Sequence, residues 1–290
     1  MKAAGRIVIY LKYTKPRVWI LLVFIGGIGA IISAGSNIFL KMPMILLAIL
    51  TLVAGTAGSE AITNYIDRDI DSRMKRTAGR PLVTGKVTKK EALILGFALI
   101  SLAIAPLLFF ERYYAACFMI AGILDNVVVY SFLLKRKTPW SIIFGGFSGG
   151  FPVVIGWYTV TNAFSITPWA LFFLVVIWIP IHIWSIAFLY KEDYSNAGIP
   201  MLPVVYSDET SARAIAYSAL SLSIFSILLC FIERHPVVYL LSTIILASPL
   251  IYFSYKFLKT PDKKASLALF KYSNLFLAIL FSLFAIITFV

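Results

Sequence analysis

The feature that most constrains this chain is a series of long apolar segments, which together account for most of its length. A helix needs about 20 predominantly apolar residues to cross the hydrocarbon core of a bilayer. Nine segments reach or approach that length: 18–35, 43–66, 91–110, 113–134, 140–161, 167–190, 213–232, 237–257 and 268–289. Composition agrees, because 60% of the residues are hydrophobic and only 13% are charged, whereas soluble chains are about 45–50% apolar and about 25% charged. We therefore predict an all-α integral membrane protein, a single domain (1–290) of nine transmembrane helices in a bundle around a central cavity, with the glycine-rich segment 140–161 bent.

Positive charge is distributed unevenly along the chain. Lys and Arg number 26 against 13 acids, a net charge of +13, which in a soluble protein would suggest binding to nucleic acid. If the N-terminus is cytoplasmic, 23 of the 26 basic residues fall on the cytoplasmic side, and only Lys41, Arg112 and Arg234 fall outside. This is the positive-inside pattern of membrane proteins. It predicts a multi-pass protein of the cell membrane with no nucleic-acid partner, whose long cytoplasmic loops, 67–90 and 191–212, carry the function.

An acidic cluster lies where the second apolar segment enters the first long loop. At 3.6 residues per turn, Asn64, Asp67 and Asp71 lie on one stripe of a helix. Glu60 lies one turn deeper and Asp69 points to the opposite side. Carboxylates held this close disfavour one another's charge, and a divalent cation offsets that cost. Oxygen ligands suit Mg²⁺, so we predict a Mg²⁺ site with Asn64, Asp67 and Asp71 as ligands. The sequence does not assign a role to Glu60.

A run of basic residues follows the acidic cluster. Its members are Arg68, Arg73, Lys75, Arg76, Arg80, Lys86, Lys89 and Lys90. Carboxylates for a metal beside a cationic loop are the combination that a diphosphate requires. The alternative is an ordinary helix end, with solvated acids and with bases held at anionic headgroups. The single-face spacing of the acids favours the first interpretation, and Arg68, Arg76 and Arg80 are its predicted diphosphate ligands.

The same segment carries a resemblance to a known family. Asn64-Tyr-Ile-Asp-Arg-Asp-Ile-Asp71, then Met74-Lys-Arg-Thr77 and Arg80-Pro-Leu-Val83, resembles the first signature of the UbiA-type intramembrane prenyltransferases, and in particular of their haem-farnesylating branch, the haem O synthases. The strong motifs lie within about residues 60–210. The resemblance implies a Mg²⁺-dependent transfer of the farnesyl group of farnesyl diphosphate to a vinyl group of haem B. It also implies a partner in terminal-oxidase haem maturation.

The second long loop departs from the quinone-type members of that family. Their second signature is D-x-x-x-D, and here Tyr190 and Tyr194 stand at the two aspartate positions. The segment Lys191-Glu-Asp-Tyr-Ser-Asn-Ala-Gly-Ile-Pro-Met-Leu-Pro203 instead matches the haem branch. The resemblance implies that Asp193 is a further metal ligand and that Lys191 binds the diphosphate. Tyr190 and Tyr194 either donate hydrogen bonds to phosphate or line the prenyl path.

A third group of candidates lies between the two loops. Asn126-x-x-x-Tyr130 precedes Lys135-Arg136-Lys137-Thr-Pro-Trp140. Taken alone, the three bases are a topology anchor. Within the resemblance, Tyr130, Lys135 and Arg136 become diphosphate ligands and Asn126 lines the cavity. Asp125 lies within a span, where an acid needs a partner or a watery cavity, and it receives no role.

The sixth apolar segment contains a lone histidine, His182, between Pro180 and Trp184. A histidine within a membrane span forms a helix–helix hydrogen bond about as often as it binds a ligand. The resemblance implies a contact to haem, and both interpretations stay open.

Two other functions compete with this one. Prenyl transfer to a quinone precursor or to a glycerol-phosphate lipid would be marked by a second D-x-x-x-D motif, which this sequence does not have. A cation-coupled membrane transporter would place acids near the middle of the membrane on several helices. Here the acids lie at the cytoplasmic rim beside a basic loop.

Overall fold

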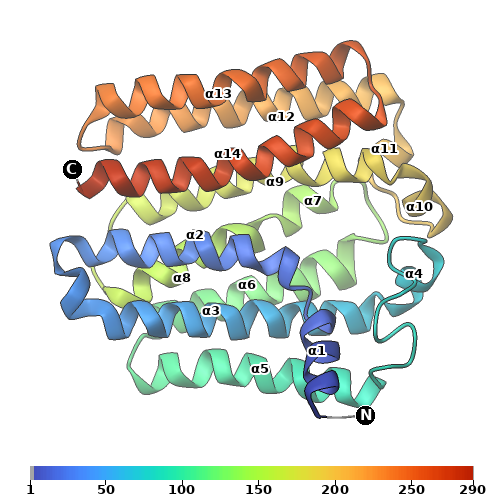
Figure 1. Cartoon of the computed structure of the whole chain (residues 1–290), viewed down its shortest axis with the longest axis horizontal. Helices are drawn as coiled ribbons and strands as arrows, with labels where there is room; N and C mark the ends of the chain where they lie inside the picture. Colours follow the sequence, from blue (N-terminus) through green and yellow to red (C-terminus); the bar gives the residue numbers. More distant parts are fainter. Residues whose placement is uncertain (1–2, 290) are drawn as a thin grey trace.

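The computed structural model describes residues 3–289, which fold into helices and connecting turns without a strand (Figure 1). In Figure 1 the long helices lie side by side with nearly parallel axes. In chain order the α-helices, long and short, are α1 (Ala3–Tyr13), α2 (Pro16–Ala34), α3 (Ile38–Ile66), α4 (Arg68–Arg73), α5 (Lys89–Phe109), α6 (Tyr113–Leu124), α7 (Ser141–Gly145), α8 (Phe147–Val160), α9 (Thr167–Leu189), α10 (Lys191–Asn196), α11 (Leu202–Val205), α12 (Asp208–Leu228), α13 (Pro236–Lys259) and α14 (Lys263–Phe289). The predicted all-α membrane fold is confirmed.

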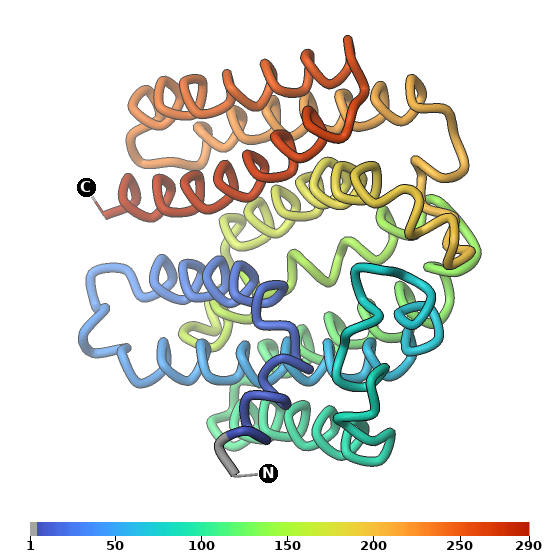
Figure 2. Tube along the Cα trace, turned by 45° about the vertical axis from the view of Figure 1, so that its right-hand side comes forward, coloured from blue at the N-terminus to red at the C-terminus, as the bar shows by residue number. Residues whose placement is uncertain are grey.

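Eight helical segments among the described residues are long and apolar enough to cross a membrane. The first, Pro16–Ile66, has 51 residues. A continuous helix of that length would measure about 77 Å, more than twice the thickness of the hydrocarbon core. Instead, the 3₁₀ turn η1 (Gly35–Asn37) folds the chain back, and α2 packs along α3 (Figures 1 and 2). The sequence prediction of nine crossings counts α2 and α3 as two crossings instead of one segment. The number of crossings and the cytoplasmic side of the N-terminus stay predictions.

The two ends of the described chain lie at opposite ends of the bundle. Helix α1 lies at the same end as α4 and α10, whereas α14 ends at the other (Figure 1). A chain that crosses a membrane an odd number of times has its two ends on opposite sides, as here. The end with α4, α10 and α11 therefore holds both long loops, and the buried side chains of Ile70, Met74, Ile199 and Met201 fix these loops to the bundle.

The bend expected in the glycine-rich segment is present, because α7 and α8 are separate helices that meet at Gly146. A helix that begins inside a span leaves amide groups without partners. Asp125 supplies one partner, since its Oδ2 accepts a hydrogen bond from the backbone N–H of Ser148 at 2.7 Å. The positive end of the α8 dipole also favours a carboxylate there. Asp125, to which the sequence assigned no role, thus compensates the break in the helix.

Helices α2 and α8 approach so closely that their backbones touch. A Cβ atom at Gly156 would lie 1.9 Å from the carbonyl oxygen of Gly26, and one at Gly26 would lie 2.7 Å from the carbonyl oxygen of Pro152. Small residues permit such contacts between membrane helices, where dispersion replaces the hydrophobic effect as the source of cohesion. This packing holds α2 against the centre of the bundle and fixes the chain that enters α2.

Candidate active site

The predicted acidic stripe lies at the end of α3 and continues into α4. The backbone N–H of Asp67 bonds to Thr63 O at 2.9 Å, and that of Asp71 bonds to Asp67 O at 2.8 Å, so the helical register passes through the junction. Asn64, Asp67 and Asp71 are therefore buried on one side, with exposed fractions of 3%, 3% and 4%. Asp69 is exposed on the other side, as the helical period requires.

Two cations from different parts of the chain neutralise the buried carboxylates. Arg80 Nη1 donates to Asp71 Oδ2 and, at 3.2 Å, to Asn64 Oδ1. Lys135 Nζ donates to the Oδ2 of Asp67. Burial disfavours the charge on Lys135, but the attraction and hydrogen bond of Asp67, together with Tyr130 and Tyr194, outweigh it and raise the pKa of the Lys135 ammonium. Asn64 is held in turn by Tyr13, whose carbonyl oxygen accepts from Asn64 Nδ2 at 2.6 Å.

The second carboxylate oxygen of Asp67 is the most informative atom of the site. Asp67 Oδ1 is buried, and no hydrogen-bond donor contacts it within residues 3–289. An unpaired buried carboxylate oxygen costs free energy unless a partner arrives from outside the chain. This oxygen can therefore take a cation from outside the chain, and Asn64 and Asp71 on the same face of the helix offer further oxygens of the kind that Mg²⁺ takes. Within residues 3–289, no group of three or more His, Cys, Asp or Glu is arranged to hold a metal by itself.

Asp193 joins this region from the second loop. It lies in α10, is 9% exposed, and its Oδ2 accepts a hydrogen bond from the backbone N–H of Arg76 at 3.2 Å. The guanidinium of Arg76 stands over the ring of Tyr190, 4.9 Å from the ring centroid. The two long loops therefore contact each other at Asp193 and Tyr190, as the proximity of their traces in Figure 2 also indicates.

These side chains surround a cavity of about 190 Å³. It is lined by polar and charged residues from five parts of the chain together with three apolar ones. They are Lys15, Val18, Glu60, Thr63, Asp67, Ile70, Asp71, Met74, Arg76, Arg80, Asn126, Tyr130, Ser131, Lys135 and Tyr194. The structure thus brings together eight of the residues singled out from the sequence: Asp67, Asp71, Arg76, Arg80, Asn126, Tyr130, Lys135 and Tyr194.

One wall of the cavity comes from the π-helix η2 (Asp125–Leu134), which continues α6. Its i→i+5 pattern extends to Lys135, whose N–H bonds to Tyr130 O at 2.8 Å. Lys135 therefore lies one turn after Tyr130, with its ammonium 5.6 Å from the centroid of the tyrosine ring. Asn126 is fixed by a hydrogen bond from its Nδ2 to Ser59 Oγ at 2.9 Å. Such π-helical turns occur frequently at functional sites, and nothing in the amino-acid pattern indicated this one.

Sequence reasoning missed Lys15 and gave no role to Glu60. Lys15 connects α1 to α2 with a left-handed backbone (φ 55°), and its Nζ lies 2.9 Å from Glu60 Oε2 at the cavity. Burial lowers the pKa of Lys15, and the attraction of Glu60 opposes that shift. The sequence does mark this position as a break between helices, because a residue before proline is biased away from the α-helical backbone conformation. Lys15 precedes Pro16 at the mouth of the first span, but its charge was read only as a topology signal.

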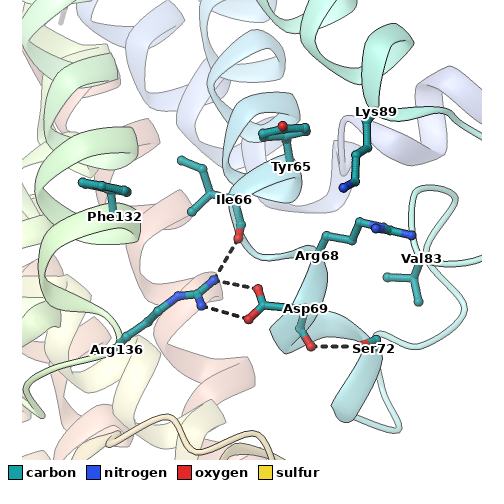
Figure 3. A pocket seen from close by; sticks show the side chains of 9 residues that line it. All are labelled: Tyr65, Ile66, Arg68, Asp69, Ser72, Val83, Lys89, Phe132 and Arg136. Carbon is teal, nitrogen blue, oxygen red and sulfur yellow. Dashed lines mark hydrogen bonds and ion pairs between the residues drawn. The ribbon is translucent and has the colours of Figure 1, made fainter.

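Seven residues singled out from the sequence do not line the cavity. Asn64 and Asp193 adjoin it, because they hydrogen-bond to the lining residues Arg80 and Arg76. The other five lie elsewhere. Arg136 points to the opposite side of α3, where its guanidinium pairs with both carboxylate oxygens of Asp69 at 2.9 and 2.7 Å (Figure 3). Arg68 lies on that same side. Lys191 pairs with Asp208 at 2.7 Å, and Tyr190 lies under Arg76 as described above.

His182 packs within the bundle instead of lining the cavity. Its ring is stacked between those of Trp178 and Phe270, at centroid distances of 4.3 and 4.6 Å. Its Nδ1 lies 3.2 Å from Ser273 Oγ on α14. These contacts match the helix–helix hydrogen bond that the sequence left open as one of its two interpretations.

Comparison with known proteins agrees with this geometry. A protoheme IX farnesyltransferase of Thermoplasma volcanium is 53% identical over 279 residues, which are 96% of this chain and 97% of that protein. A digeranylgeranylglyceryl phosphate synthase structure superposes with a TM-score of 0.73 at 22% identity, over 98% of this chain and 99% of that one. A UbiA homologue of Archaeoglobus fulgidus, bound to GPP and Mg²⁺, superposes with a TM-score of 0.62 at 17% identity, over 95% and 99% of the two chains. The model of the UbiA prenyltransferase family matches residues 15–280, and the chain therefore belongs to that family.

Proposed function

We propose that this chain transfers the farnesyl group of farnesyl diphosphate to a vinyl group of protohaem IX, in a Mg²⁺-dependent reaction. Its membership of the UbiA prenyltransferase family makes it an enzyme that transfers prenyl groups. The acceptor is inferred from the Thermoplasma volcanium relative, a protoheme IX farnesyltransferase. The single observation that carries the site is the buried, unpartnered Oδ1 of Asp67 in a cavity that is also lined by several cations.

The metal would be held by oxygen ligands alone. We assign Asp67, Asp71 and Asn64 as its ligands, with Asp193 approaching from the second loop. Mg²⁺, when bound there, would neutralise the diphosphate and make it a better leaving group. The related A. fulgidus structure is bound to GPP and Mg²⁺, which supports a divalent cation with a prenyl diphosphate in this fold.

The cations of the cavity would bind the diphosphate oxygens. Arg80 and Lys135 are paired with Asp71 and Asp67, and an arriving diphosphate offers them a second anionic partner. Arg76 and Lys15 also line the cavity. Charge-assisted hydrogen bonds from such groups stabilise negative charge that accumulates on the leaving group. We leave Arg68, Arg136 and Lys191 out of this set because they do not line the cavity.

The reaction requires that water be kept from an allylic cation. The bond between C1 of the farnesyl group and the diphosphate oxygen breaks, and its electron pair leaves with the diphosphate. A vinyl carbon of haem then forms the new bond to C1, which moves the positive charge to the haem side. Only then does water add to that cation and lose one proton, which gives a hydroxyethylfarnesyl product. The rings of Tyr130 and Tyr194 line the cavity, and their π-faces can stabilise the allylic cation while the surrounding helices exclude water.

The wider setting is also a proposal. We infer that residues 1–290 act as one domain, with loops 67–90 and 191–212 on the cytoplasmic side of the cell membrane, because 23 of the 26 Lys and Arg fall on that side. The product would pass to the maturation of a terminal oxidase.

The direct test incubates the purified protein with farnesyl diphosphate, Mg²⁺ and haem B, and measures haem products by mass spectrometry. We expect a haem that is heavier by one farnesyl group and one hydroxyl group, and no product in excess EDTA. Parallel reactions offer a quinone-precursor ring and a prenylated glycerol phosphate as acceptors. Transfer to one of these instead of haem would overturn the haem assignment and keep the prenyltransferase mechanism.

The metal assignment has its own test in the same assay. Asp67→Asn and Asp71→Asn remove one charge each without changing side-chain size, and we expect each to lower the rate by at least about 100-fold, the typical effect of removing one element of an electrostatic site. A near-normal rate in either variant would show that the assigned ligand does not hold the metal.

A further inference from the structure

A second, larger pocket lies on the opposite side of α3 from the candidate active site. It has a volume of about 750 Å³ and is lined by Tyr65, Ile66, Arg68, Asp69, Ser72, Val83, Lys89, Phe132 and Arg136 (Figure 3). It shares no lining residue with the first cavity. Neither the proposed reaction nor the family comparison gives it a role.

The charges of this pocket do not cancel. Three cations and one carboxylate line it, which leaves a net charge of +2. The charge of Arg136 is already compensated, because it pairs with Asp69, and its Nη2 also donates to Ile66 O at 2.8 Å. Arg68 and Lys89 have no acidic partner within residues 3–289. In Figure 3 the ammonium of Lys89 points toward the side chain of Arg68, and two like charges in one pocket favour an anion between them.

The depth of the pocket indicates which kind of anion. Each of its three cations lies within two residues of the end of an apolar span, since α3 ends at Ile66, α5 begins at Lys89 and η2 ends at Leu134. These are the positions where a helix leaves the hydrocarbon core and reaches the level of the lipid phosphates.

The walls of the pocket distinguish a lipid from a dissolved anion. Phe132 on η2 is 66% exposed, and Ile66 and Val83 add further apolar surface. The two spans that flank the pocket are also poorly covered by other helices. In the most apolar stretch of each span, only 22% of the residues of Lys89–Phe109 and 11% of those of Tyr113–Leu134 are buried inside the protein. The pocket therefore lies on a flank of the bundle that faces lipid, where a headgroup and its chains can be accommodated together.

We propose that this pocket binds the phosphate of an anionic phospholipid, with Arg68 and Lys89 as its ligands and Phe132 against the start of the acyl chains. The Arg136–Asp69 pair forms the floor and holds η2 against the end of α3. A basic pocket between membrane helices is a known mode of anionic lipid recognition. This lipid is not a substrate, because α3 separates the pocket from the cavity that holds the unpartnered Asp67 oxygen.

Native mass spectrometry of the delipidated, full-length protein tests the proposal. Phosphatidylglycerol and phosphatidylcholine are added separately at equal concentration, and the fraction of protein that retains one lipid is measured. We expect phosphatidylglycerol to be retained in preference, and each removed charge to reduce its binding about fivefold. Lys89→Gln should therefore bind more weakly than the unchanged protein, and Arg68→Gln/Lys89→Gln more weakly still.

The matched control is Lys86→Gln/Lys90→Gln, which removes two exposed charges from the same segment outside the pocket. It should retain phosphatidylglycerol as the unchanged protein does. If the control loses as much lipid as the pocket variant, or if both lipids are retained equally, the specific site does not exist. If millimolar inorganic phosphate displaces phosphatidylglycerol completely, the pocket binds phosphate alone and the lipid assignment is wrong. Thermal unfolding of every variant confirms that the fold is intact.

Discussion

Lys135 and Asp67 form a buried ion pair between the π-helical turn η2 and the end of α3, with side-chain exposures of 14% and 4%. The pair leaves the other oxygen of Asp67 without a hydrogen bond. Removing one member of a buried pair is strongly destabilising because the remaining charge has no partner. The pair therefore contributes to stability and, in the proposed function, to substrate binding, and the two effects can be separated experimentally.

We expect Lys135→Met to reduce the free energy of unfolding by about 3 kcal/mol in EDTA. Millimolar Mg²⁺ should restore part of this loss, because a metal at Asp67 compensates the same charge. Thermal unfolding in the two buffers measures both effects. Lys137→Met is the control, since Lys137 is exposed and outside the pair. An equal loss of stability with and without Mg²⁺ would contradict a metal at Asp67.

Asp193 and Glu192 are adjacent acids with different expected roles. Asp193 is 9% exposed and faces the first loop, whereas the side chain of Glu192 is 80% exposed and pairs with Lys263. If Asp193 contributes to the metal site, Asp193→Asn should raise the Mg²⁺ concentration for half-maximal activity by about 10–100-fold, as is typical for groups that support a metal. Glu192→Gln should leave it unchanged. A Mg²⁺ titration of the transfer assay compares the two, and equal curves would remove Asp193 from the site.

Lys15 is a charged residue of the cavity that the sequence motifs do not include. Its ammonium lines the cavity, so we expect Lys15→Met to raise the KM for farnesyl diphosphate about tenfold, the effect of one hydrogen bond to a charged group. Lys12→Met removes an exposed charge of α1 and controls for the general electrostatic attraction of an anionic substrate. Initial rates against substrate concentration give both constants. A fall in kcat with unchanged KM would mean that Lys15 only holds Glu60.

Glu233, at the opposite end of the bundle, predicts a pH dependence of stability. Burial raises its pKa to about 7, although Arg234 N–H donates to it. Because the folded state binds this proton more tightly than the unfolded state, the stability that it contributes is complete below about pH 4.5 and is lost as pH rises to about 7.

The thermal unfolding midpoint should therefore fall across that interval, corresponding to at most about 3 kcal/mol. Glu233→Gln should flatten the profile. Glu111→Gln, at an exposed acid on the same side, should leave it as it is. A profile that is unchanged in Glu233→Gln would assign the pH dependence to other groups.

The acidic half of the site could be predicted from the sequence because it depends on the helical period alone. Asn64, Asp67 and Asp71 share a face in any helix, so their common burial followed from their spacing. The membrane fold was predictable for a similar reason, since long apolar segments have few alternatives.

The basic half could not be assigned in this way. Lys135 and Arg136 are neighbours of the same charge, yet one enters the cavity and the other pairs with Asp69 on the far side of α3. Their directions are set by the π-helical turn that precedes them, which changes the period by one residue per turn and has no sequence signature. His182 could not be assigned for a different reason. A histidine is equally suited to bind a ligand or to form a hydrogen bond between packed helices, and only the neighbouring rings of Trp178 and Phe270 favour the second role.

The contact between the two loops has a consequence for how the sequence can vary. Asp193 accepts its hydrogen bond from the main chain at position 76, not from the arginine side chain. Nineteen of the twenty amino acids could supply that donor, and only proline could not. The side chain of Arg76 is thus not needed for this hydrogen bond. It stands over the ring of Tyr190 and lines the cavity, while the contact of Asp193 with the first loop depends on the path of the backbone. A comparison of side chains between relatives would miss this contact, although it brings Asp193, the third carboxylate of the proposed metal site, toward the other two.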